Sequence, residues 1–155
     1  MDGVDGLSIQ ETWNPESICF GCGSANPQGL RIRSFADGDD VLCTWQPEGH
    51  HGAVVDVLNG GIVSTLLDCH SGAAVAWAIK KATSDWPDPA TSPVTARLSI
   101  EFLRPTPVGK PLQLVARVVE SQDDRFTIEA RLESEGRVCA TSNAVFVRLR
   151  PRPGS

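Results

Sequence analysis

The segment 59–68 combines a helix start with a single acid. It opens with Asn59, Gly60 and Gly61, and Asp68 follows eight residues after Gly60. Asn is a favoured N-cap residue, and glycines let a ligand approach the first amide N–H groups of a helix closely. Those groups lack helical acceptors and lie at the positive end of the helix dipole. They could hold a carbonyl oxygen that becomes negative during attack, with ionised Asp68 as the nucleophile or as the base that activates water.

Each part of this pattern has a common structural explanation when it stands alone. Asn-Gly-Gly is a frequent turn and helix start, and a helical Asp usually lies on an exposed or paired face. Here the helix is apolar on almost every side, so a carboxylate in it is costly unless it is paired or used. Ser64, Asp68 and Ser71 share one helix face. We predict that Gly60 and Asp68 are catalytic. The predicted substrate-binding residues on this helix are Asn59, Gly61, Ser64 and Ser71.

Two cysteines, Cys19 and Cys22, open the segment CFGCGSANPQGL with a spacing found in zinc sites and redox dithiols. A tetrahedral zinc site needs four ligands. Cys43, Cys69 and Cys139 are isolated in the sequence, without a second CxxC or a paired Cys/His motif. Turn-forming residues follow Cys22, whereas a redox cysteine usually begins a helix. We therefore predict no metal site and no cofactor, and interpret the segment as a compact turn over one wall of a substrate pocket.

The elements that must position these residues follow from hydrophobic patterning. One helix is predicted from about Gly60 to Lys81, ended by the proline-rich segment 84–93. Two strands precede it, at 30–35 and 40–47, and four long strands follow, at 94–103, 111–121, 125–134 and 138–149. One buried helix with an antiparallel sheet of about six strands is α+β. Residues 1–16 are expected to form an N-terminal arm and residues 150–155 a disordered tail.

Composition limits the possible partners. The 155 residues suit one domain, and the net charge of -5 gives no basic footprint for nucleic acid. No apolar run approaches the roughly 18 residues that span a bilayer, and the first residues lack the features of a signal peptide. Five scattered cysteines do not suggest a disulfide framework. We expect a cytoplasmic protein without a nucleic-acid or membrane partner.

The segment VLNGGIVSTLLDCHSGAAVAWA resembles the core motif of hotdog acyl-CoA thioesterases of the phenylacetic-acid-degradation (PaaI-like) type. That family typically has His-Gly-Gly, six residues and then Asp, where this chain has Asn59, Gly60, Gly61, six residues and Asp68. CFGCGSANPQGL resembles the N-terminal signature of one branch, and VTARLSIEFLRPTPVG and GRVCATSNAVFV resemble later strands. The resemblance covers residues 17–149. It implies a hotdog domain there, with a curved antiparallel sheet wrapped around one long central helix.

The resemblance also implies roles for individual residues. Gly60 matches the glycine whose amide polarises the thioester carbonyl, and Asp68 matches the catalytic carboxylate. Asn59 replaces the usual His, but it can still donate a hydrogen bond and cap the helix. Gly72 stands where some relatives place a hydroxyl that orients the attacking water, and Ser64 or Ser71 could take that role.

The activity implied by the resemblance is hydrolysis of an acyl- or aryl-CoA thioester to the free acid and coenzyme A. His51, in the loop before the helix, is a candidate for substrate contact, and Arg97 for the phosphates of coenzyme A. A non-catalytic acyl-CoA-binding hotdog protein is one alternative. A hotdog dehydratase acting on acyl thioesters is another, although it typically needs a His that faces the acid.

Helix geometry predicts the assembly. Gly60 and Asp68 lie roughly 12 Å apart along a helix axis, at 1.5 Å per residue. A thioester carbon must lie about 3 Å from both the attacking group and the donor to its carbonyl. A single straight helix cannot meet both demands. We therefore expect a homodimer, or a dimer-of-dimers tetramer, with sites at the dimer interface that use Gly60 of one chain and Asp68 of the other.

Overall fold

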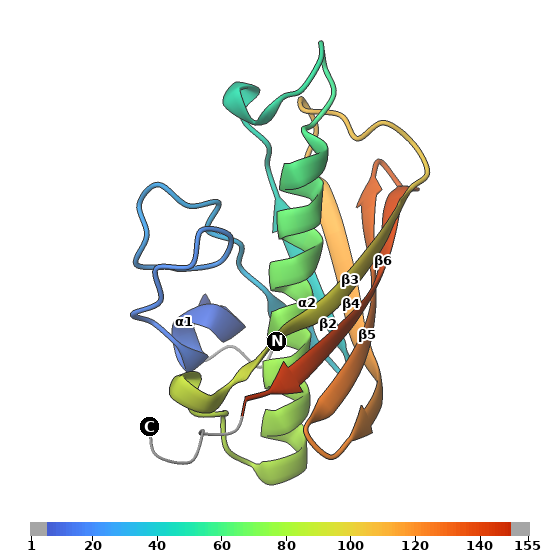
Figure 1. Ribbon diagram of the computed structural model, residues 1–155. Coiled ribbons are helices and arrows are strands. Elements are labelled where there is room, and N and C mark those ends of the chain that lie inside the picture. The colour runs from blue at the N-terminus through green and yellow to red at the C-terminus, as the bar shows by residue number, and fades with distance from the viewer. Residues whose placement is uncertain (1–5, 150–155) are drawn as a thin grey trace.

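A long helix, α2 (Gly60–Thr83), lies against one face of a six-stranded antiparallel sheet in the computed structural model (Figure 1). The structure describes residues 6–149, so the predicted tail at 150–155 lies outside the described residues. The sheet order is β1-β2-β4-β5-β6-β3. The strands are β1 (Phe35–Asp37), β2 (Asp40–Trp45), β3 (Pro93–Phe102), β4 (Leu112–Gln122), β5 (Arg125–Ser134) and β6 (Arg137–Arg148). This arrangement confirms the predicted α+β hotdog fold.

Alternating side chains explain how the sheet and the helix pack. In β2 and β5 every second residue is buried, so one face of each strand joins the core. The largest fully buried side chains of the sheet meet those of α2, among them Leu66 and Leu67 from the helix and Leu114 and Ile128 from the sheet. This packing holds α2 in a fixed position along its length.

The length and hydropathy of α2 contradict one expectation. Over 18 residues its mean hydropathy is 1.4, so by length and composition alone it could cross a membrane, and the prediction that no segment reaches this limit was wrong. In the structure, 56% of that window is buried inside the protein. The apolar surface of α2 is therefore used in packing against the sheet.

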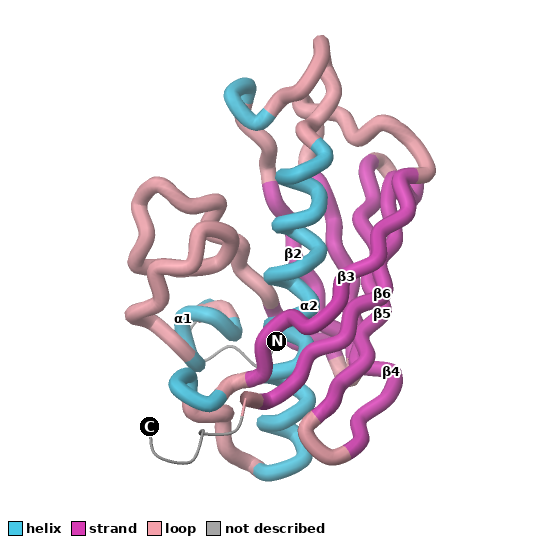
Figure 2. Tube along the Cα trace, in the orientation of Figure 1, coloured by secondary structure: helices cyan, strands magenta, loops and turns pink. Residues whose placement is uncertain are grey.

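Residues 6–34, which include the described part of the predicted arm, contain structure that the sequence did not predict. A short helix, α1 (Ile9–Trp13), begins with a capping box in which Ser8 and Glu11 satisfy each other's backbone amides. The predicted strand at 30–35 is mostly loop (Figure 2). Its backbone amides instead bond back to the cysteine-containing turn, from Leu30 N to Phe20 O at 2.8 Å and from Ile32 N to Gly21 O at 3.0 Å. Single-turn 3-10 helices, η2 (Gly49–His51) and η3 (Pro89–Thr91), flank α2 in the sequence.

A buried histidine joins these N-terminal elements to the core. His70 is fully buried on α2, with Nε2 2.8 Å from Val41 O and Nδ1 2.8 Å from Ser34 Oγ. Since a carbonyl can only accept, Nε2 carries the proton and Nδ1 accepts from the Ser34 hydroxyl. Ser34 Oγ in turn accepts from Gln10 Nε2 of α1 at 2.9 Å. Burial lowers the pKa of His70 to about 4, so the ring is neutral.

We expect His70→Leu to lower the free energy of unfolding by about 2–4 kcal/mol, because the buried Ser34 hydroxyl loses its acceptor and the Val41 carbonyl loses the donor from the ring. Urea unfolding followed by circular dichroism measures the change. His50→Leu is the control, since His50 is largely exposed and its replacement should stay within about 0.5 kcal/mol. A loss below about 1 kcal/mol in His70→Leu would contradict the bridging role of this side chain.

Candidate active site

The side chain of Asn59 accepts hydrogen bonds from some of the backbone amides at the start of α2 and leaves another open. Its Oδ1 accepts from Gly61 N at 2.8 Å and from Ile62 N at 3.3 Å. Among residues 6–149 nothing accepts the N–H of Gly60. Asn59 N also donates to His51 O at 2.9 Å, which fixes the preceding loop to the helix start. The open amide at this end of the helix is therefore that of Gly60, while the amide of Gly61 serves the cap.

Asp68 lies half-buried in the middle of α2, and its carboxylate is held by a residue that the sequence did not single out. Thr95 Oγ1, on β3, donates to Asp68 Oδ1 at 2.6 Å. Burial is the main cause that raises the pKa of Asp68, and the hydrogen bond from Thr95 opposes it. Thr95 was missed because 27 residues separate it from Asp68 and only the sheet topology brings them together. With Oδ1 oriented by Thr95, Oδ2 is the oxygen that can face a substrate or water.

The two serines predicted to share the face of Asp68 do not share its environment. Ser64 is partly exposed and donates to Gly60 O at 2.8 Å. Ser71 is fully buried and donates to Leu67 O at 2.7 Å. Three residues advance a helix by roughly 300°, and here the 60° difference turns Ser71 into the core. The prediction that Ser71 contacts substrate is therefore wrong, whereas Ser64 stays on the partly exposed side of α2.

His51 and Arg97 lie at the surface, on two different elements. His51 Nδ1 accepts from Glu48 N at 2.9 Å, so its Nε2–H is the free donor of the ring. Burial and the neighbouring His50 lower the pKa of His51, which favours the neutral ring. Arg97 is exposed on β3, where the pairing with β6 shifts register between Thr95 and Arg97.

An apolar groove adjoins the start of α2. It encloses about 400 Å³ and is lined by Val54, Val57, Leu58, Val63, Phe102, Leu103, Arg104, Pro105 and Thr106. A Cβ built on Gly60 would lie 3.7 Å from the ring of Phe102, so one lining side chain of the groove lies beside Gly60. A larger hollow, of about 650 Å³, is lined instead by residues such as Arg117, Glu129 and Asn143, and none of the candidate catalytic residues lines it.

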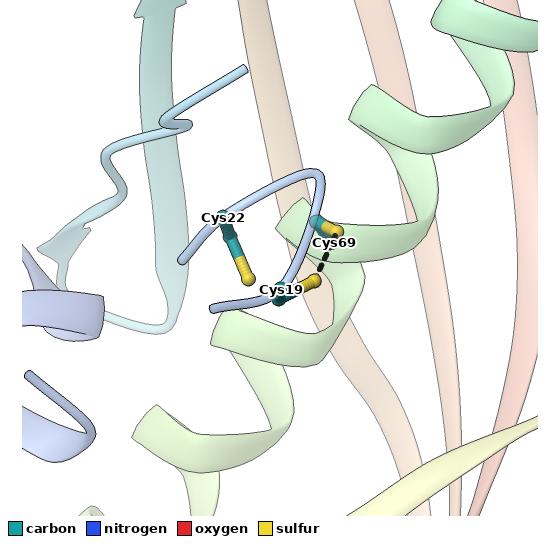
Figure 3. Close-up of side chains that lie close together, drawn as sticks. All are labelled: Cys19, Cys22 and Cys69. Atoms are coloured by element: carbon teal, nitrogen blue, oxygen red, sulfur yellow. Dashed lines mark hydrogen bonds between the residues drawn. The ribbon is translucent and has the colours of Figure 1, made fainter. Parts of the chain in front are cut away.

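The turn containing Cys19 and Cys22 packs on the middle of α2, where it meets a third cysteine (Figure 3). Cys69 was interpreted as isolated, but its Sγ lies 3.8 Å from Cys19 Sγ, and all three sulfurs lie within 4.8 Å of one another. The interpretation was wrong because sequence spacing does not show which loop a helix face contacts. Hydrogen bonds from the other two thiols lower the pKa of Cys19, while the interaction with Cys19 raises the pKa of Cys22 to about 12 and also raises that of Cys69.

Solved structures share this fold. A thioesterase superfamily protein from Shewanella loihica is 25% identical, with a TM-score of 0.65 over 82% of this chain and 98% of its own. A protein from Bacillus halodurans, solved with CoA, is 26% identical, with a TM-score of 0.63 over 79% of this chain and 77% of its own. The PaaI protein of Escherichia coli, from the phenylacetic acid degradation operon, shares the fold at 19% identity, with a TM-score of 0.60 over 77% of this chain and 84% of its own. No curated protein matches significantly.

A family model for the thioesterase superfamily matches residues 56–141, which is more than half of the chain. The matched segment contains the Asn59 cap, the open Gly60 amide, Asp68 and its partner Thr95. The resemblance carried by the Gly-Gly-to-Asp motif is thereby confirmed, and the chain belongs to the thioesterase superfamily.

Proposed function

We propose that this protein hydrolyses an acyl- or aryl-CoA thioester to the free acid and coenzyme A. The observation that carries the proposal is the half-buried carboxylate of Asp68, which Thr95 of β3 orients. Asp68 lies on α2, the helix whose first amide, that of Gly60, is open. Membership of the thioesterase superfamily supports a thioester substrate. The relative from Bacillus halodurans that was solved with CoA supports coenzyme A as its thiol part.

In the proposed reaction, the Gly60 N–H donates to the thioester oxygen as it becomes negative. Asp68 either attacks the carbon or takes a proton from the attacking water, and its raised pKa makes it a better base than an exposed carboxylate. The Thr95 hydroxyl keeps one carboxylate oxygen in place, which is a positioning role. Asn59 uses its Oδ1 for the cap, which leaves its side-chain amide as a second donor where related enzymes typically have His.

The groove beside Gly60 fits the apolar part of an acyl or aryl group. Its lining is largely aliphatic and aromatic, and such surfaces favour apolar ligands. His51 has a free Nε2–H at the loop that is bonded to the helix start, where it can donate to the substrate. Arg97 is exposed and offers a charged group for a phosphate of coenzyme A.

A dehydratase is disfavoured by the placement of the histidines. His70 is the histidine nearest to Asp68 in the sequence, but it is fully buried and bonds to Ser34 and Val41. Its ring therefore cannot face the carboxylate as a second catalytic group. Hydrolysis needs only the acid, a water and the amide donor.

We propose that each site is shared by two protomers. Asp68 and Gly60 belong to one continuous helix and are separated by roughly 12 Å along its axis. Large apolar side chains near Gly60 are also exposed in the single chain, with Val54, Val55, Phe102 and Leu103 between 55% and 88% exposed. β3 lies at the edge of the sheet and pairs only with β6 among the described strands. A second copy would cover this surface and bring Gly60 of one chain to Asp68 of the other.

We expect Asp68→Asn to lower kcat for acyl-CoA hydrolysis by more than tenfold, a barrier increase of at least about 1.4 kcal/mol, because the amide can neither attack nor accept a proton. The measurement is thiol release from a panel of acyl-CoAs. Asp85→Asn is the matched control, since Asp85 is exposed in the turn after α2 and should keep full activity. Retention of more than a tenth of wild-type turnover in Asp68→Asn would remove Asp68 from its central role.

Thr95 allows a finer test. We expect Thr95→Val to lower kcat by roughly tenfold while KM stays within about twofold, because the carboxylate loses the donor that orients it. Val preserves the shape and the strand preference of Thr. Thr95→Ser keeps the hydroxyl and should recover most of the activity. Equal rates for the Val and Ser variants would show that the hydrogen bond to Asp68 does not matter for turnover.

The shared-site arrangement is tested by mixing two inactive variants, Asp68→Asn and Gly60→Pro. Proline removes the Gly60 N–H at the first helical position, where it is tolerated, and Asn59 already has the extended backbone that precedes a proline. In randomly mixed dimers half are heterodimers with one intact site each, so about a quarter of all sites should recover.

Gly60→Ala is the control for the proline variant, because it keeps the N–H and its Cβ has room beside Phe102. It should therefore stay active, unlike Gly60→Pro. If heterodimers form from folded Gly60→Pro and Asp68→Asn chains but the mixture stays at background activity, each site belongs to a single chain.

A further inference from the structure

Three thiols from two distant segments meet on the exposed side of α2. Cys19 and Cys22 come from the turn before β1, and Cys69 comes from the middle of the helix, directly after Asp68. Figure 3 shows the three side chains close together, with the Cys19 sulfur facing that of Cys69, and all three sulfurs lie within 4.8 Å of one another. The Sγ atoms of Cys19 and Cys69 are 3.8 Å apart. That separation is far longer than a disulfide bond of about 2.05 Å. It equals the edge of about 3.8 Å expected for a tetrahedron with zinc–sulfur bonds of about 2.3 Å.

The turn is built to bring its two cysteines onto the helix. A Cβ on Gly21 would lie 2.3 Å from Cys69 Sγ, so only a residue without a side chain lets the turn lie this close. A Cβ on Gly23 would lie 2.4 Å from Cys19 N, so the second glycine closes the turn on itself. The backbone amides of Gly21 and Cys22 lie close enough to the Cys19 sulfur to help lower the pKa of that thiol. Amide donors to a ligating sulfur orient the ligand and stabilise its negative charge.

The donor set indicates the class of ion. Three thiolates on one site suit a borderline-soft divalent ion such as Zn²⁺, whereas Mg²⁺ and Ca²⁺ prefer oxygen ligands. Within residues 6–149, no fourth His, Cys, Asp or Glu has a ligand atom within 4.8 Å of all three sulfurs. Asp68 is engaged with Thr95 instead. Because Cys19 is exposed, water can reach the fourth position of a tetrahedron.

We propose that Cys19, Cys22 and Cys69 bind one zinc ion, with a water molecule as the fourth ligand. The ion fastens the turn at residues 17–30 to the middle of α2, beside the candidate catalytic carboxylate. This proposal replaces the sequence-based prediction of no metal, which depended on Cys69 being isolated. It is independent of the proposed hydrolysis, since it concerns metal content and thiol chemistry alone.

Elemental analysis of untagged protein, purified from zinc-supplemented cells, is the first test. We expect one zinc per chain in the wild type, and at least a tenfold loss of zinc affinity in Cys22→Ser and in Cys69→Ser. Cys43→Ala is the matched control, because Cys43 is buried on β2 away from this cluster, and it should keep its zinc. Less than a tenth of an equivalent of zinc, with no uptake of added zinc by the reduced protein, would overturn the proposal.

Cobalt substitution of the wild type keeps the proposal testable even if the serine variants fail to fold. Co²⁺ added to the reduced, metal-free protein should give a sulfur-to-cobalt charge-transfer absorption with an intensity expected for three thiolates, which stoichiometric Zn²⁺ then removes. Absence of this band would count against the site. A disulfide among these cysteines in protein purified without reductant, together with the absence of bound metal, would also overturn the proposal and identify a redox pair.

Discussion

The packing of α2 against the sheet is the interaction on which the rest of the structure depends. Ten of its residues are buried, so the helix cannot rotate or slide without losing core contacts throughout the sheet. The groups of both proposed sites lie on the part of the helix outside the core: the open Gly60 amide at one end, Asp68 near the middle and Cys69 directly after it. The helix is thus both the centre of the fold and the rigid support of the candidate site.

Two of the contacts that position this site come from neighbouring elements rather than from the helix. Thr95 on β3 orients Asp68, and the loop containing His51 is tied to the helix start through the Asn59 amide. Asn59 stands where the family typically has His. Its Oδ1 caps the helix, as expected from the preference for Asn at this position. The side-chain NH2 group of Asn59 is therefore the part left to donate to a substrate.

Local sequence patterns predicted the elements whose bounds are set by local signals. The span of α2, its Asn59 cap and the four strands after it follow from periodicity, capping and turn residues. The predicted strand at 30–35 failed because Arg31 adopts a positive φ of 55° and the segment bonds to the cysteine turn rather than to the sheet. Thr95 and Cys69 were missed for a related reason. Each acts through a contact with a residue far away in the sequence, and no pattern within one segment encodes such a contact.

The edge strand β3 has a consequence for association with the wrong partners. A ten-residue strand with one free edge is a template for any other extended chain. β3 begins with Pro93, which has no N–H to donate, and its register shifts between Thr95 and Arg97. Arg97 and Glu101 add opposite charges along the same strand. An incoming strand must match this irregular edge and its charges. The proline, the register shift and the charged side chains of β3 therefore oppose aggregation through this edge.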